Sequence, residues 1–351
     1  MNPSTTHPDP GAPAPREVRG LPKAQLHLHL TGAMRPTTLA ALAARDGVDV
    51  PPPLPTTVGT WADFQHRYDT ARTVIRTPAD VHRVVTEAAE DDAADGCGWL
   101  EIQVDPTSYA PVFGGLAPAL EAVIDAARQA PVPTGVIVAS AWTRAPEHAV
   151  TLARLAARYA GDGVVGFGLS NDERHATVAD FAPAFAITAD AGLLAVPHAG
   201  FYTGPRHVRA CVEHLRADRI GHGTAAARDP ATLSLLAERQ VALEICPTSY
   251  PPFGVHELAT IPLRPLLDAG VPVALATDDP LLFGTGLAAQ YAICRDVLGL
   301  TDAELARVAA ASIRHSAAPQ QLKAELQRRV DSWLRDGSPR PGTASSAPAA
   351  C

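Results

Sequence analysis

The chain has 351 residues, of which 46% are hydrophobic and 19% charged, and a formal net charge of −8 at pH 7. These values are typical of a soluble globular protein, and no apolar run approaches the roughly 20 residues that cross a bilayer. The negative charge excludes the usual electrostatic footprint of a nucleic-acid-binding protein and favours a small-molecule substrate. The oligomeric state stays open.

The N-terminal segment, MNPSTTHPDPGAPAPREVRG, has no apolar core of the signal-peptide type, so we expect a cytoplasmic enzyme without a membrane partner. Residues 1–18 and 336–351 are rich in small residues and proline and are predicted to be disordered tails around one domain, residues 19–335. The cysteines show no paired spacing, which disfavours both a disulfide framework and a thiolate zinc site. They are Cys97, Cys211, Cys246, Cys294 and Cys351.

Residues 24–30 have the period of a β-strand with one polar face. Apolar residues at 26, 28 and 30 alternate with His27 and His29, so both imidazoles point the same way. Imidazoles two residues apart can bind one zinc or similar divalent ion. Taken alone, the pair is better explained as polar residues of an edge strand, since histidine is often simply a polar strand residue.

A long segment, residues 48–95, separates this strand from the next and begins with the Pro-rich PPPLP. A segment of this size after a barrel strand lies at the catalytic mouth and commonly forms a lid. Trp61, Phe64 and Tyr68 would form an aromatic stripe on a helix there. We expect the stripe to pack this helix against the rest of the protein, and Phe64 is also a candidate to line a substrate pocket.

Short β-branched runs then alternate with Ala- and Leu-rich segments of helical period. Strands are predicted at 24–30, 98–104, 132–139, 164–169, 193–198, 218–222, 241–245 and 271–277. Helices are predicted at 36–46, 79–95, 116–129, 146–159, 177–190, 205–216, 229–238, 262–269 and within 301–334. The pattern predicts the α/β class and a TIM-type (β/α)8 barrel, with a helical insertion after the first strand and C-terminal helices. An open doubly wound sheet is the alternative, but no Gly-rich phosphate turn follows the first strand.

Histidines and acidic residues collect on the first predicted strand and at the ends of three others. His198 ends the fifth strand, His222 ends the sixth, and Asp278 and Asp279 follow the eighth. Because the carboxyl ends of barrel strands share one face, these residues and the first histidine pair predict a metal site.

Six stretches of the chain resemble the adenosine deaminase branch of the metal-dependent amidohydrolases, in that family's order and approximate spacing. They are PKAQLHLHLTGAM, VVGFGLSNDE, VPHAGFYTG, DRIGHGTAA, ALEICPTS and ALATDDPLLF, within about residues 20–330. The resemblance implies that His222 orients and deprotonates a metal-bound water and that Asp279 contacts the substrate ring. It also implies one zinc ion with four ligands: His27, His29, His198 and Asp278. The same ligand types accept iron, nickel or cobalt, and the fourth strand offers no lysine to bridge a second metal.

Three residues depart from the family's pattern where it reads the substrate. Phe201 stands where the family has the glutamate that protonates the purine ring, and losing such an acid costs on the order of a hundred-fold in rate. Asn171 replaces a glycine whose backbone meets the purine, and Thr31 replaces an acidic residue that reaches the ribose. We therefore expect Thr31, Phe64, Asn171 and Phe201 to contact an amino-bearing purine-like or other heterocycle, rather than ordinary adenosine.

Other acids could stand in for the missing glutamate. Asp105 follows the second strand, and Asp172 and Glu173 follow the fourth. Their positions suit a turn residue and a helix N-terminal charge pair, and we favour those structural roles.

Three functions stay open at this point. The first is a zinc-dependent deaminase acting on an amino-bearing heterocycle. The second keeps the metal but catalyses hydrolysis or a lyase reaction at another C–N bond, which needs no ring acid and is motivated by Phe201. The third is a barrel that only binds a purine-like ligand. The retained pair His222 and Asp279 favours an enzyme.

Overall fold

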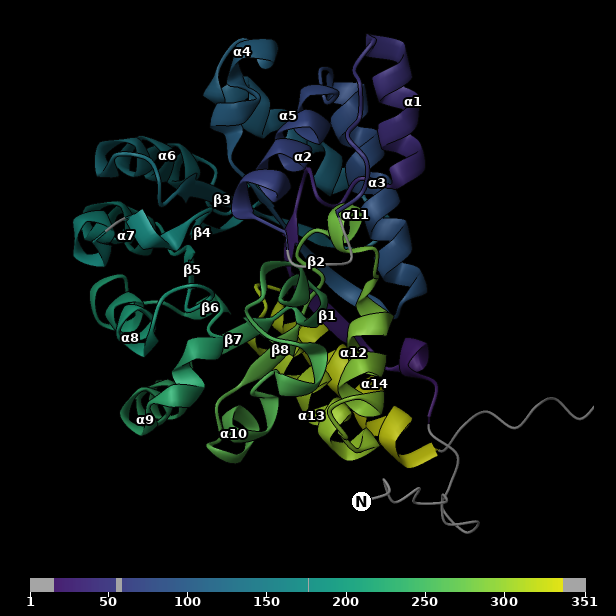
Figure 1. Cartoon of the computed structure of the whole chain (residues 1–351), viewed down its shortest axis with the longest axis vertical. Helices are drawn as coiled ribbons and strands as arrows, with labels where there is room; N and C mark the ends of the chain where they lie inside the picture. The colour runs from purple at the N-terminus through teal and green to yellow at the C-terminus, as the bar shows by residue number, and fades with distance from the viewer. Residues whose placement is uncertain (1–15, 55–58, 176, 337–351) are drawn as a thin grey trace, which may run out of the picture.

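The computed structural model describes residues 16–54, 59–175 and 177–336, and eight parallel strands stand at its centre (Figure 1). Each strand pairs with its neighbours in sequence, from β1 to β8. The strands are β1 (Lys23–His29), β2 (Cys97–Val104), β3 (Thr134–Ala141), β4 (Val164–Ser170), β5 (Leu194–Ala199), β6 (Arg219–His222), β7 (Ala242–Ile245) and β8 (Val273–Leu275). The predicted TIM-type (β/α)8 barrel is confirmed.

The ring closes between its first and last strands at one short contact. Leu28 and Asp278 form an isolated parallel bridge. The backbone N–H of Asp278 donates to the carbonyl of His27 at 3.0 Å, and the N–H of His29 donates to the carbonyl of Asp278 at 3.1 Å. The residue predicted as a metal ligand therefore also joins the two ends of the sheet.

Helices surround the strands in Figure 1 and cover the outer faces of the barrel. Those that follow successive strands are α1 (Pro36–Asp46), α2 (Trp61–Thr73), α3 (Pro78–Ala94), α4 (Ala110–Phe113), α5 (Leu116–Gln129), α6 (Pro146–Arg158), α7 (Ala182–Asp190), α8 (Pro205–His214), α9 (Pro230–Arg239) and α10 (Leu263–Asp268). The chain ends with α11 (Pro280–Phe283), α12 (Leu287–Asp296), α13 (Asp302–His315) and α14 (Gln320–Asp336). Within the described ranges, no helix has both the length and the apolar character needed to cross a membrane.

Most of the predicted helices agree with the structure. The helix expected at 177–190 starts as a 3-10 turn, Val178–Phe181, and becomes α-helical at Ala182, next to a proline that suits a first turn. The C-terminal helical region divides into α13 and α14, because Ser316 adopts an extended backbone before Pro319. Helix α12 and the short helices α4 and α11 were not predicted.

The insertion after β1 contains α2 and α3, as predicted from the sequence. The Thr60 side chain accepts from the N–H of Asp63, and Asp63 in turn accepts from the N–H of Thr60, which fixes the start of α2. The Phe64 ring of α2 stacks on Phe283 of α11, with centroids 5.9 Å apart. The aromatic stripe therefore packs α2 across the carboxyl ends of the strands.

The predicted tails lie mostly outside the described residues, which exclude 1–15 and 337–351. Residues 16–18, assigned to the N-terminal tail, contact the C-terminal helices. The Trp333 indole donates to the carbonyl of Glu17 at 3.0 Å, and the Val18 side chain is buried. The domain boundaries and the cytoplasmic location stay predictions.

Candidate active site

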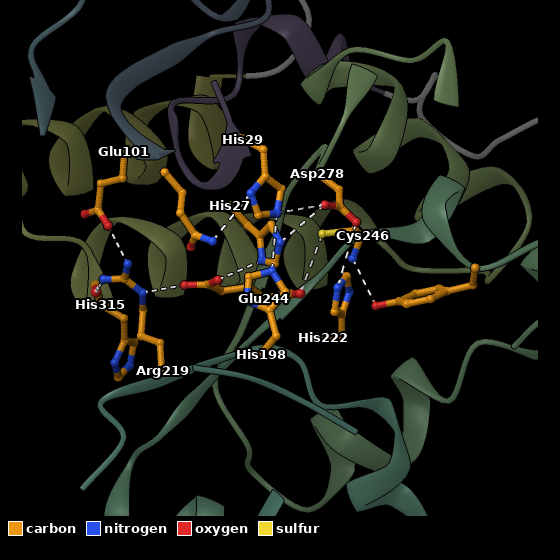
Figure 2. A network of polar contacts seen from close by, with 12 residues as sticks. His27, His29, Glu101, His198, Arg219, His222, Glu244, Cys246, Asp278 and His315 are labelled. Carbon is orange, nitrogen blue, oxygen red and sulfur yellow. Dashed lines mark hydrogen bonds and ion pairs between the residues drawn. The ribbon is translucent and has the colours of Figure 1, made fainter. Parts of the chain in front are cut away.

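The barrel brings the four predicted metal ligands to one point at the carboxyl end of the strands (Figure 2). The Nε2 atoms of His27 and His29 lie 3.4 and 3.3 Å from Oδ1 of Asp278. Nε2 of His198 lies 3.3 Å from Nε2 of His29. Strand register contributes to this convergence, since His198 in β5 pairs with Gly221 in β6, which has no side chain to fill the space.

These atoms fit a divalent cation. Nε2 of His27 is buried and has no hydrogen-bond partner among the described residues. Burial, followed by the charge of His27, lowers the pKa of His198 well below its usual value, so this ring is neutral. Burial would raise the pKa of Asp278, but the neighbouring rings of His27 and His29 hold it well below the usual range. Burial would lower the pKa of His27, but its carboxylate neighbours Asp278 and Glu244 raise it to about 10, so binding a cation would displace a proton from this ring. With that proton lost, the site offers neutral imidazoles and an ionised carboxylate, the ligand set that zinc binds.

His222 lies beside this group with its Nε2 atom 3.8 Å from Oδ2 of Asp278. Burial lowers the pKa of His222 to about 3, and its Nδ1 atom has no partner among the described residues. The ring is therefore neutral, although the neighbouring charge of Asp278 opposes this shift. His222 and Asp278 have φ angles of 66° and 62°, a left-handed backbone that is uncommon for non-glycine residues and occurs here also at Asn171, Arg216 and Gln240.

Asp279 is buried beside the same centre, and its Oδ1 atom has no hydrogen-bond partner in the described part of the chain. Burial and the charge of Asp278 raise the pKa of Asp279 well above its usual value. Gly32 leaves the space for this side chain, because a Cβ atom there would lie 1.8 Å from Oδ1 of Asp279. A protonated Asp279 can donate a hydrogen bond to a ligand.

A cavity of about 270 Å³ opens above these residues. His29, His198, His222, Asp278 and Asp279 line it. An aromatic group lines another part: Trp61, Phe64, Phe201, Tyr202, Phe253 and Phe283. The remaining lining includes polar and charged side chains from α2 and the loops after β2 and β3: Tyr68, Asp69, Arg72, Asp105, Ser108, Tyr109 and Arg144.

Phe201 fills the position where the sequence comparison places an acid. Its ring centroid lies 4.7 Å from that of His222, 4.8 Å from that of Tyr202 and 5.4 Å from that of Phe253. The ring thus joins the aromatic group to His222. Of the other predicted substrate contacts, Phe64 also lines the cavity.

Asn171 and Thr31 have different surroundings. Asn171 lines the cavity with a φ of 71°, and its Nδ2 atom donates to Oε1 of Gln65 in α2 at 3.1 Å. Thr31 is fully buried, is not among the lining residues, and shares a 2.6 Å hydrogen bond with the hydroxyl of Tyr109, which does line the cavity. The structure brings Asn171 to the substrate space and places Tyr109 beside Thr31 instead.

The alternative acids have structural partners. Asp105 caps the turn after β2, accepting from the N–H of Thr107 at 2.9 Å. Asp172 is paired with Arg174. Glu173 lines the cavity, but its Oε1 atom accepts from the N–H groups of Tyr202 and Thr203 at 2.7 and 2.6 Å. Glu173 therefore holds the loop that presents Phe201.

Sequence reasoning missed the buried polar residues behind the ligands. Oε2 of Glu244 lies 2.9 Å from Nδ1 of His27, and the Trp142 indole donates to the carbonyl of His198 at 3.0 Å. Glu244 was detectable in principle, since it is a charged residue within a short apolar strand, ALEI. Glu101 in CGWLEIQV carries the same signal.

Comparisons with known proteins agree with this geometry. The family model described as adenosine deaminase matches residues 22–333. A Streptomyces coelicolor protein with the provisional name adenosine/adenine deaminase is 54% identical over 91% of this chain and 98% of its own length. The aminodeoxyfutalosine deaminase of the same organism is 36% identical over 90% of this chain and 85% of its own length.

Among solved structures, the adenine deaminase of Arthrobacter aurescens superposes with a TM-score of 0.82 at 28% identity, covering 90% of this chain and 99% of that chain. The family match spans nearly all of the described barrel, including each of the strands that carry the clustered histidines. The chain therefore belongs to the adenosine deaminase family of metal-dependent hydrolases.

Proposed function

We propose that this protein is a hydrolytic deaminase that removes an amino group from a purine-like substrate in the cavity above the histidine cluster. The proposal assigns one zinc ion to His27, His29, His198 and Asp278. The observation that carries it is the convergence of these side chains, with Nε2 of His27 and of His29 at 3.4 and 3.3 Å from one carboxylate oxygen. The family match supports the reaction type.

The site residues divide the chemistry between them. A divalent cation lowers the pKa of a water molecule that it binds. His222, neutral and with its Nε2 atom 3.8 Å from Oδ2 of Asp278, takes the role of proton acceptor from that water. Asp279, with its raised pKa and free oxygen, takes the role of hydrogen-bond donor to a ring nitrogen.

Phe201 defines the substrate class. Its ring, the neighbouring Tyr202 and Phe253, and Phe64 on α2 offer apolar faces for a flat heterocycle. The same ring supplies no proton to the substrate. We therefore assign to this chain an amino-bearing purine-like substrate other than ordinary adenosine. Similar proteins are named for adenosine/adenine, adenine and aminodeoxyfutalosine, which leaves both a free base and a substituted nucleoside as candidates.

A screen for ammonia release tests the function. The zinc-loaded protein is incubated with adenosine, deoxyadenosine, adenine and other amino-heterocycles, and His222→Ala is assayed in parallel. We expect release from at least one amino-heterocycle, slow release from adenosine, and loss of turnover in the variant. Brisk release from adenosine contradicts the assignment made from Phe201, and unchanged turnover in His222→Ala contradicts its role.

Phe201 also motivates a second candidate, hydrolysis or a lyase reaction at another C–N bond, because such a step needs no ring acid. Absence of ammonia release across the screen, with a metal-dependent change in the absorption spectrum of one compound, would favour this candidate. A chain that binds such compounds without any turnover would instead be a binding protein.

A further inference from the structure

A line of buried charged side chains runs through the barrel interior, away from the substrate cavity (Figure 2). It begins at His27, whose Nδ1 atom lies 2.9 Å from Oε2 of Glu244 in β7. Oε1 of Glu244 accepts from Nε of Arg219 at 2.6 Å, and Nη2 of Arg219 donates to Glu101 in β2. The side chains of these four residues are at most 1% exposed.

The far end of the line reaches the C-terminal helices. Nη1 of Arg219 donates to the carbonyl of His315, the last residue of α13, at 2.8 Å. Oε1 of Glu101 accepts from the N–H of Ala317 at 2.6 Å and from the indole of Trp99 at 2.8 Å. Glu101 is therefore bonded on both oxygens and does not touch His27.

The bond to Glu244 decides which nitrogen of His27 is free. An ionised carboxylate accepts only, so it holds a ring proton on Nδ1, and Nε2 is the nitrogen left to give its lone pair to a cation. Nε2 is the atom that faces Asp278. Gly221 confines the ring from another side, since a Cβ atom there would lie 2.8 Å from Cε1 of His27.

We propose that Glu244, Arg219 and Glu101 are positioning residues for the metal ion. They fix the tautomer and orientation of His27, and they link the affinity for metal to the segment between α13 and α14. The inference depends on the metal site of the proposed function. It extends beyond that function, because it assigns a role to residues that contact neither substrate nor metal.

Arg219 connects Glu244 to Glu101, so the buried charges form one network rather than two separate ion pairs. One guanidinium binds two carboxylates and a helix-terminal carbonyl, and its planar fork fixes their relative positions. A change at Glu101 is therefore transmitted to Glu244 through Arg219. Partners that orient a metal-binding histidine typically contribute about 10- to 100-fold to metal affinity.

The test measures zinc dissociation constants of the full chain by competition with a chromophoric chelator, together with the thermal midpoint of the metal-free form. We expect Glu244→Gln to weaken zinc binding by about 10- to 100-fold and Glu101→Gln by about tenfold. The double variant should bind zinc no more weakly than Glu244→Gln alone, because both changes break the same line.

Ser312→Ala is the matched control. Ser312 is fully buried on α13, and its hydroxyl accepts from the N–H of Ala24 in β1 at 2.9 Å, outside the line of charges. This variant should lower the thermal midpoint without changing the zinc constant. Glu101→Gln behaving in the same way, with an unchanged zinc constant, would overturn the inference.

A second variant covers the case in which Glu101→Gln does not fold. Arg219→Lys keeps the charge but loses the fork, and we expect weaker zinc binding from a folded protein. Wild-type affinity in Arg219→Lys would also overturn the inference. Failure of the wild-type chain to bind any divalent metal contradicts the proposed function itself, whereas zinc binding that is insensitive to these three residues contradicts the positioning role alone.

Discussion

The rings of Phe201 and His222 lie in contact, with centroids 4.7 Å apart and planes inclined at 59°. An apolar ring thus borders the histidine to which we assign the role of proton acceptor. Since the loop bearing Phe201 is held by the Glu173 carboxylate, its position is determined by the backbone and not only by ring packing.

Replacing the ring with an acid should change the substrate range. Phe201→Glu places a carboxyl group where the family has its proton donor, and a positioned general acid is worth on the order of a hundred-fold in rate. We expect the kcat/KM for adenine or adenosine to rise by about that factor, measured by ammonia release. Phe201→Gln, of the same size but without an acidic proton, is the control. An equal rise in both variants would show that cavity shape, not acid catalysis, limits the rate.

Metal removal should abolish activity without unfolding the barrel. The barrel has a continuous apolar core, so its fold does not depend on the ion as a small zinc domain does. We expect dialysis against a chelator to reduce ammonia release to about a hundredth or less, since the water activation supplied by the metal is lost. Stoichiometric zinc should restore it. Full activity after verified removal of all transition metals would contradict the proposed reaction.

Gly32 should be intolerant of any side chain. The Cβ atom of Gly32→Ala would lie 1.8 Å from Oδ1 of Asp279, so this carboxyl must move. We expect a large fall in kcat and a loss of about 1–3 kcal/mol in the free energy of unfolding, as is typical of overpacking. Gly204→Ala is the control, because no atom lies within 4 Å of the added carbon there. Unchanged kcat in Gly32→Ala would exclude Asp279 from the reaction.

Tyr109 lines the cavity, whereas Thr31 does not line it and holds the Tyr109 hydroxyl by a hydrogen bond. Variants of the two residues should therefore have different effects. Tyr109→Phe removes a hydroxyl from a residue that lines the cavity, so we expect a higher KM. Thr31→Val leaves that hydroxyl without its 2.6 Å partner, and we expect a loss of about 1–3 kcal/mol in unfolding free energy with a smaller change in KM. A larger KM effect from Thr31→Val would instead support the direct substrate contact predicted from the sequence.

Most of the fold could be predicted because its signals are local. The alternation around His27 and His29 places both rings on one face, and the order of strands and helices then brings His198 and Asp278 to the same end of the barrel. Helix α12 was missed, since its start after Gly286 has no side-chain cap.

The surroundings of the ligands could not be predicted in the same way. The hydroxyl of Tyr109 meets Thr31 across 78 positions of sequence, and Arg219 meets Glu101 across 118. No pattern along the chain encodes such pairs. A glutamate in the middle of an apolar strand indicates that a buried partner exists, but the partner's identity depends on how the side chains of several strands fill the barrel interior.

Asp278 contacts β1 in two ways. Its backbone forms a bridge to that strand, and its carboxylate faces the imidazoles of the same strand. A cation bound there would stabilise the contact that closes the barrel. It would connect β1, the first strand to be synthesised, to the segment that follows β8, the last. Binding of the ion would then stabilise the closed barrel as well as supply the reaction. The amide protons that join β1 to Asp278 should therefore exchange faster with solvent after the ion is removed.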